Sequence, residues 1–285
     1  MSRITGEHHA LRKFTNAAFS AACVVATVIA VVPLFGILYY VAARGMQGIN
    51  WDFFTQLPKP VGETGGGMAN GILGTLKLVG LASVMGIPPG VLAGVYLAEF
   101  GQTRMGSVVR FSADVLSGIP SITVGIFIYS LVVLTTKTFS TIAGALALAV
   151  IMLPTVTRTT EELLRLVPES LREAALGLGV PKWRATLRVM LRTAAPGIAV
   201  GIMLAVARVA GETAPLLFTA FSNRFWSDSL LEPTASLPVQ IYTYAVSPFE
   251  DWHRQAWAAA LVLVSLVLIL NISARLLVRN RVRKQ

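Results

Sequence analysis

Long apolar stretches separated by shorter polar segments dominate the hydrophobic pattern of the chain. Each stretch approaches or exceeds the roughly 20 residues that a helix needs to cross a bilayer. None shows the sustained alternation of apolar and polar residues that marks a membrane strand. The pattern therefore predicts an all-α integral membrane protein with six transmembrane helices, at about residues 17–43, 72–98, 115–136, 139–157, 196–221 and 255–278.

The first stretch follows Arg12 and Lys13, an arrangement that also occurs in secretory signal peptides. Its apolar part is longer than the 7–15 residues of a typical signal peptide. We therefore expect an uncleaved first span. The third stretch contains Pro120 and Ser121 in the segment Ser-Gly-Ile-Pro-Ser, which predicts at least a kink and allows a non-helical turn that lines a cavity.

The polar segment 158–195 has its own helical pattern. Pro168 suits a first helical turn, Gly177 and Gly179 suit a helix end, and Pro181 can start a second helix. The segment therefore predicts two short helices joined at a glycine bend. Two interpretations stay open: a docking element for a cytoplasmic partner, or an amphipathic pair that lies on anionic lipid.

The fifth stretch contains an arginine near its middle, followed closely by a glutamate and a proline. Arg208 within a bilayer is costly, so its side chain should face protein or water. Glu212 is four residues further on, on the same face of a helix, and Pro215 predicts a kink near Gly211. The guanidinium group can bind an oxyanion on a translocation path, or it can form a structural pair with Glu212.

A glycine-rich segment, 65–71, precedes the second stretch. Its backbone amides could cradle an anion. Alternatively, it is a tight turn in which Asn70 caps the following helix. The loop 222–254 and its flank contain Trp226, Trp252 and Trp257, which fit an interfacial aromatic belt.

Composition supports the membrane interpretation and excludes several other classes of protein. Apolar residues make up 54% of the chain and charged residues 13%, with a mean hydropathy of +0.67, whereas soluble domains are about 25% charged. A disordered chain, a disulfide scaffold and an ordinary cytosolic enzyme are excluded. Cys23, the single cysteine, cannot form an internal disulfide.

The net charge of +10 reflects membrane topology. Between the predicted spans, 17 Lys and Arg residues lie on one side and five on the other. The positive-inside rule places both termini in the cytoplasm. A nucleic-acid partner is therefore a poor explanation of the positive charge, and membrane lipid is the expected surrounding.

Several chemistries have no motif in this sequence. It contains no phosphate-binding G-x-x-x-x-G-K-[ST] loop, so we expect any ATP and Mg²⁺ to be bound by a partner. The three histidines lie outside the predicted spans, which argues against a histidine proton relay. We find no metal-ligand pattern and no Ser/His/Asp set, so no catalytic residue and no cofactor are assigned to the chain.

Four segments resemble the permease subunits of ABC importers. Glu173-Ala174-Ala175, followed by Gly179, resembles the EAA loop of binding-protein-dependent permeases. Three further segments resemble phosphate permeases of the PstA type, over roughly residues 60–280: 153–162, 118–122 and 208–215. The sequence departs from the general loop pattern at Val189-Met190-Leu191-Arg192, where Ile-x-Leu-Pro is common.

The resemblance implies a type I ABC importer permease fold. It divides the chain into 1–60, with the first span, and a permease core at 61–285. In this interpretation the EAA loop seats in an ATPase subunit. Arg208, Glu212 and Thr213 belong to the translocation path, and the nearby helix breaks are at Pro120, Ser121, Gly211 and Pro215.

The resemblance also implies partners and a location. The expected partners are a PstC-type permease that forms a heterodimer with this chain, two PstB-type ATPases that bind ATP and Mg²⁺, and a PstS-type phosphate-binding protein. The chain itself would be a transport subunit of the bacterial inner membrane and no enzyme. Alternatives remain: import of molybdate or sulfate, proton-coupled transport that uses Glu212, or a structural or regulatory membrane subunit.

Overall fold

The computed structural model describes residues 4–282, which are helical except for connecting loops and one isolated β-bridge between Pro58 and Gly66. Three of the basic residues counted for topology, Arg3, Arg283 and Lys284, lie outside the described residues. Within residues 4–282, five helices are long and apolar enough to cross a membrane, and a sharply bent pair adds a sixth crossing if it counts as one. The predicted all-α membrane fold is confirmed.

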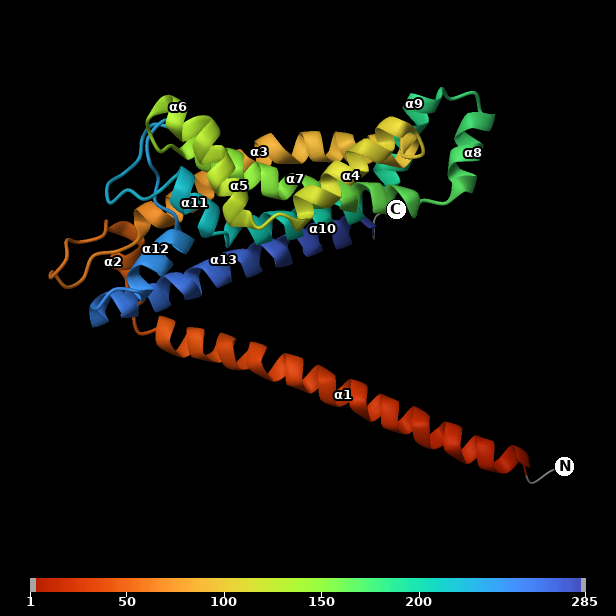
Figure 1. The fold of residues 1–285 in the computed structure, drawn as a ribbon, viewed down its shortest axis with the longest axis horizontal. Coiled ribbons are helices and arrows are strands. Elements are labelled where there is room, and N and C mark those ends of the chain that lie inside the picture. The colour runs from red at the N-terminus through yellow and green to blue at the C-terminus, as the bar shows by residue number, and fades with distance from the viewer. Residues whose placement is uncertain (1–3, 283–285) are drawn as a thin grey trace.

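Four of the predicted spans lie in single long helices. These helices carry the predicted stretches that begin at residues 17, 72, 139 and 255, and each extends beyond the apolar stretch at one or both ends. They are α1 (Ile4–Gly45), α3 (Ala69–Phe100), α7 (Thr141–Arg165) and α13 (Glu250–Val282). Two short helices, α2 (Trp51–Thr55) and α12 (Leu237–Ala245), lie together at one end of the molecule (Figure 1).

The third predicted span is not a kinked helix but two helical segments bent by 104°. The first is α4 (Arg104–Gly118), and the second comprises α5 (Ser121–Ile128), the π-helix η1 (Tyr129–Val133) and α6 (Leu134–Thr136). Ile119 and Pro120 between them are extended, with ψ of 130° and 135°. Proline disfavours the helical conformation of the residue before it and has no N–H to donate, so the helix ends there.

The predicted fifth span, 196–221, has the wrong boundaries. Helix begins at Lys182 and continues through α9 (Lys182–Ala185), the π-helix η2 (Thr186–Met190) and α10 (Leu191–Ala210). A separate short helix, α11 (Ala214–Thr219), follows. Helix persists across Pro196 because Met190, Ala194 and Ile198 are buried in one apolar cluster on both sides of the proline. Prolines are tolerated in membrane helices when neighbouring helices support them.

Helices α3 and α7 form the centre of the bundle. In the most apolar 18-residue segment of α7, 61% is buried inside the protein, whereas none of the corresponding segment of α1 is buried. Three glycines spaced by four residues, Gly86, Gly90 and Gly94, form a glycine stripe on α3 against α7. A Cβ on Gly94 would lie 2.5 Å from the Cβ of Thr160. The stripe lets the two backbones approach closely, as small residues do in membrane bundles.

Asn70 is not a helix cap, which corrects the prediction. It is the second residue of α3, and its side chain is buried. Its amide nitrogen donates to the carbonyl of Asn223 at 2.6 Å, and its oxygen accepts from Gln240 Nε2 at 3.2 Å. Asn70 therefore ties the start of α3 to the loop after α11 and to α12.

The arrangement of the helices gives the molecule two distinct ends. The loops around α2, α11 and α12 gather at one end, and the helix α8 (Glu169–Gly177) projects at the other (Figure 1). The start of α1 and the end of α13 both point toward the end that carries α8. Helix α1 meets the body near Gly45 and diverges from it along most of its length.

Candidate functional site

Helix α8 carries the predicted EAA residues on a short projection. It starts after Pro168 and ends at Gly177, and Gly179 has a positive φ of 74°. Val180 N donates to the Ala175 carbonyl at 3.1 Å, which closes the bend. No neighbouring atom lies within 4 Å of a Cβ built on Gly179, so the left-handed backbone, and not crowding, favours glycine there.

The projection presents one face to the body and another to solvent. Ala175 is buried, whereas Glu173 and Ala174 are exposed. Leu176 and Leu178 are also exposed, Leu178 by 84%. Exposed apolar side chains on a segment outside the spans are typical of a surface that a partner covers.

The second helix of the predicted pair is not a separate short helix. It is the start of the continuous helix from Lys182 to Ala210. Arg184, Arg188 and Arg192 are exposed along it, as their spacing predicted. The π-helix η2 includes Val189 and Met190, where the sequence departs from the general EAA pattern. The chain therefore continues from the projection directly into the helix that carries Arg208.

Arg208 lies in the last turn of α10, and its side chain is exposed. The helix ends at Ala210, so Glu212 is outside it and does not share a helix face with Arg208. No ion pair or side-chain hydrogen bond joins Arg208 or Glu212 to another side chain in the part of the chain that the structure describes. The predicted structural pair between them does not form here.

The break after α10 is built by the predicted residues. Gly211 and Glu212 donate their N–H groups to the carbonyls of Arg208 and Val209, each at 3.2 Å, which closes the helix. Thr213 precedes α11, and Pro215 lies in the first turn of α11. A proline is suited to that position because its missing N–H has no helical partner to lose.

The structure brings the two predicted helix breaks together. Helix α5, which starts at Ser121 after the Pro120 bend, packs against α11 (Figure 1). Gly125 and Pro215 approach closely, because a Cβ on Gly125 would lie 2.6 Å from Pro215 Cα. Two broken helices therefore meet beside the end of α10, close to Arg208 in sequence.

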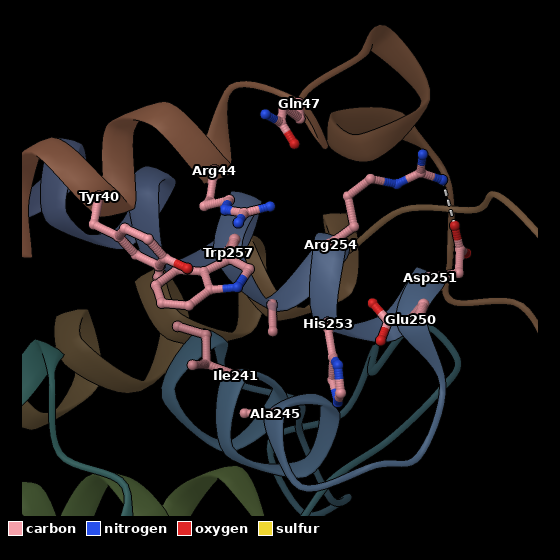
Figure 2. A pocket seen from close by; sticks show the side chains of 12 residues that line it. Tyr40, Arg44, Gln47, Ile241, Ala245, Glu250, Asp251, His253, Arg254 and Trp257 are labelled. Atoms are coloured by element: carbon pink, nitrogen blue, oxygen red, sulfur yellow. Dashed lines mark hydrogen bonds and ion pairs between the residues drawn. The ribbon is translucent and has the colours of Figure 1, made fainter.

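A cavity of about 680 Å³ lies at the C-terminal end of α1, and Figure 2 shows the side chains that line it. It lies between the end of α1 and the helices α12 and α13, where Gly48 and Gly45 pack closely against α13. Arg254 donates to Asp251 at 2.5 Å there, and Tyr40 meets Trp257 edge-on. Neither Arg208 nor Glu212 lines this cavity, so it is separate from the predicted path.

Sequence reasoning missed two buried carboxylates at the end that carries α8. Glu161, with a 2% exposed side chain, lies 2.6 Å from Arg110, 2.9 Å from Arg165 and 3.5 Å from Arg158. Glu99, with a 6% exposed side chain, lies 2.9 Å from Arg172. Glu99 directly follows the apolar stretch 72–98, and Glu161 lies four residues after the stretch 139–157. An acidic residue close to the end of an apolar stretch and near an arginine-rich segment is the signal that could have found them.

The described residues contain no group of three His, Cys, Asp or Glu side chains placed to bind a metal ion. The described residues provide instead an exposed short helix at one end and, near two helix breaks, a guanidinium group without an ion pair.

Comparison with known proteins matches the chain to permease subunits of binding-protein-dependent transport systems. Residues 90–284 match the family described as binding-protein-dependent transport system inner membrane component. The phosphate transport system permease protein PstA of Yersinia pestis is 48% identical, over 86% of this chain and 83% of its own length. The protein of the same name from Haemophilus influenzae is 44% identical, over 95% and 96%.

A more distant relative and a solved structure extend this comparison. The phosphate transport system permease protein PstA 1 of Mycobacterium tuberculosis is 39% identical, over 93% of this chain and 88% of its own length. A chain of the MetNI methionine ABC transporter, in an inward-facing conformation, superposes with a TM-score of 0.62 at 19% identity, over 75% of this chain and 95% of that one. At that identity the likeness shows the fold alone.

Proposed function

Since the chain belongs to the PstA family of binding-protein-dependent ABC importer permeases, we propose that it is a transmembrane subunit of an ATP-driven importer of inorganic phosphate. The observation that carries the proposal is the likeness to phosphate permeases along nearly the whole chain. The family is a membrane transport component, so the chain contributes a path and a coupling surface, and the chemistry of ATP hydrolysis belongs to a partner.

The ATPase partners would bind at α8. Glu173 and Ala174 face solvent, Ala175 anchors the helix to the body, and Gly179 shapes the bend. A short helix with exposed Leu176 and Leu178 suits a groove on a partner. In this proposal two PstB-type ATPases bind ATP and Mg²⁺, and their closure pulls on α8.

The phosphate path would lie between this chain and a PstC-type permease. Arg208 is exposed and unpaired among the described side chains, which supports a surface that a second subunit completes. A guanidinium group offers two parallel N–H donors to a phosphate oxygen pair. Glu212 and Thr213, in the break that follows, would lie beside the passing anion.

Glu212 would help to distinguish phosphate from sulfate or molybdate. Phosphate still carries a proton near neutral pH, and a carboxylate can accept a hydrogen bond from it. Sulfate has no such proton and would be repelled by the carboxylate. In the alternative of a proton-coupled transporter, Glu212 would instead bind the transported proton. Uptake that requires ATP would exclude that alternative.

The proposed orientation places both termini and α8 in the cytoplasm and the loops around α2 and α12 on the outer side. The distribution of basic residues, 17 against five, supports it. A PstS-type binding protein would deliver phosphate to the outer side. ATP binding would open the path outward, and hydrolysis would return it inward.

The experiment that tests the proposal measures labelled-phosphate uptake in phosphate-starved cells that lack this gene. The cells carry wild type, Arg208→Gln, Arg208→Lys or the matched control Arg192→Gln, which removes an exposed arginine from the same helix. Membrane levels of each variant are measured in parallel.

We expect wild type and Arg192→Gln to restore uptake that excess sulfate or molybdate does not inhibit. Arg208→Gln should lower uptake by about tenfold to a hundredfold, because it removes a charge-assisted contact with the anion. Arg208→Lys should fall between them, since lysine keeps the charge and loses the planar fork. Failure of wild type to restore uptake would disprove phosphate import, and normal uptake by Arg208→Gln would make that residue structural.

A further inference from the structure

We propose that Glu99 is the positioning residue that transmits movement of α8 to the membrane-spanning bundle. The proposal rests on the docking role of α8 given above and adds the link that follows docking. Glu99 is the penultimate residue of α3, at the end of the molecule that carries α8.

Glu99 holds the projecting segment at two points. Arg172, in α8, donates from Nη1 to Glu99 Oε2 at 2.9 Å. The Nζ of Lys182, the first residue of α9, lies 3.8 Å from the same oxygen. Within residues 4–282, these are the ion pairs that connect the segment from α8 to the start of α9 with α3. One carboxylate therefore fixes the projection at its middle and at its return to the bundle.

The position of Glu99 makes it dependent on these two cations. Its side chain is only 6% exposed, so water solvates it poorly. It also lies at the C-terminal end of α3, where the helix dipole disfavours a negative charge. A buried charge without its partner is strongly unfavourable. Displacement of α8 away from Glu99 is therefore costly, and α3 should follow α8.

Helix α3 can carry that movement into the bundle as a rigid element. The glycine stripe packs it directly on α7: a Cβ on Gly90 would lie 2.9 Å from the Val156 side chain. Helix α7 in turn packs on α10, where a Cβ on Gly201 would overlap the side chain of Thr159. Packing this close leaves little room for sliding. The contacts therefore continue from Glu99 to α10, which carries Arg208 in its last turn.

The other end of α3 extends the same connection to the outer side. The Thr75 hydroxyl accepts from Leu237 N at 2.8 Å, and Asn70 binds Gln240. Movement of α3 thus reaches α12 and the outer loops as well as α10. Continuous contact alone does not show that two sites are energetically coupled; a mutation along the route must change the coupling. The test therefore measures how phosphate transport is coupled to ATP hydrolysis.

The test uses the complete importer, purified with its partner subunits and reconstituted in proteoliposomes. Phosphate uptake and ATP hydrolysis are measured together for wild type, Glu99→Gln, Arg172→Gln and the charge exchange Glu99→Arg with Arg172→Glu. The matched control is Glu162→Gln. It neutralises an exposed carboxylate near the C-terminal end of α7, at the same end of the molecule as Glu99.

We expect Glu99→Gln and Arg172→Gln to retain their ATPase subunits and ATP hydrolysis but to lose about two- to thirtyfold in phosphate transported per ATP. The charge exchange should recover part of that ratio, and Glu162→Gln should match wild type. A purely structural role would lower assembly and hydrolysis together and would leave the ratio unchanged.

A normal amount of phosphate transported per ATP in Glu99→Gln would overturn the proposal. If Glu99→Gln does not assemble, a normal ratio in Arg172→Gln would overturn it instead. The proposal would also fail if the charge exchange recovered none of the lost ratio. Failure of the docking role itself would look different. In that case Leu178→Arg, which alters the exposed surface of α8, would leave the ATPase subunits bound and uptake unchanged.

Discussion

At the scale of single residues, Glu161 shows how a membrane protein accommodates charge at the end of its bundle. Its side chain is 2% exposed and lies within 4 Å of Arg110, Arg158 and Arg165. Arg110 also donates to the Gly101 carbonyl at 3.2 Å, so the cluster joins the corner between α3 and α4 to α7. The arginines are partly exposed, which lowers the cost of burying the carboxylate.

We predict that Glu161→Leu destabilises the protein by about 3 kcal/mol, because three arginines then lie together without their shared anion. The measurement is the thermal unfolding of the purified importer in detergent. Glu162→Gln, the exposed neighbour, should unfold at the temperature of wild type, since surface charges contribute little. Equal unfolding temperatures for both variants would show that the cluster does not stabilise the fold.

At the scale of helices, the glycine stripe on α3 determines how closely the two central helices pack. Gly94 has no space for a side chain, because a Cβ there would lie 2.6 Å from the Thr157 carbonyl and 2.5 Å from Thr160 Cβ. Gly80, on the same helix, has no atom within 4 Å of that position. The two glycines are chemically identical and differ only in what they face.

We therefore predict opposite effects of the same substitution. Gly94→Ala should destabilise the protein by about 1–3 kcal/mol, since the added methyl group forces α3 and α7 apart. Gly80→Ala should be neutral or stabilising by up to about 1 kcal/mol, because alanine favours helix. Thermal unfolding of both variants provides the comparison. A loss of stability in Gly80→Ala equal to that in Gly94→Ala would contradict the role of the stripe.

The helices also show what the sequence could predict and what it could not. The apolar stretches located the five long helices and the bent pair, although not all of their boundaries, since length and hydropathy are local properties. The 104° bend at Pro120 was beyond prediction because a proline indicates a break but not its angle. The sequence placed a helix start at Pro196, whereas tertiary packing of Met190 and Ile198 continues the helix through it. The absence of an Arg208–Glu212 pair likewise depends on where α10 ends.

At the scale of the whole molecule, the two ends differ in the chemistry they present. One end carries α8, with its exposed leucines, and the ion-pair clusters around Glu99 and Glu161. The start of α1 and the end of α13 point toward this end (Figure 1). The other carries the loops around α2 and α12. This polarity suits a subunit that binds ATPases on one side and receives an anion on the other.

The polarity predicts which side of the membrane each end occupies. Cys23, the single cysteine, is first replaced by serine, and one new cysteine is then introduced at one end or the other, in the separate variants Glu63→Cys and Glu162→Cys. Both native side chains are exposed, so the new thiols should react readily. The reagent is a maleimide that does not cross membranes, applied to intact cells with a permeable outer envelope and to cells with an opened inner membrane.

The excess of basic residues on one side predicts, by the positive-inside rule, that the end that carries α8 lies in the cytoplasm. The Glu63→Cys variant should therefore react in intact cells, and the Glu162→Cys variant only after the inner membrane is opened. Phosphate uptake by both variants confirms that the labelled protein is functional. The reverse pattern would place α8 outside, where no ATPase could reach it, and would contradict the proposed coupling as well as the orientation.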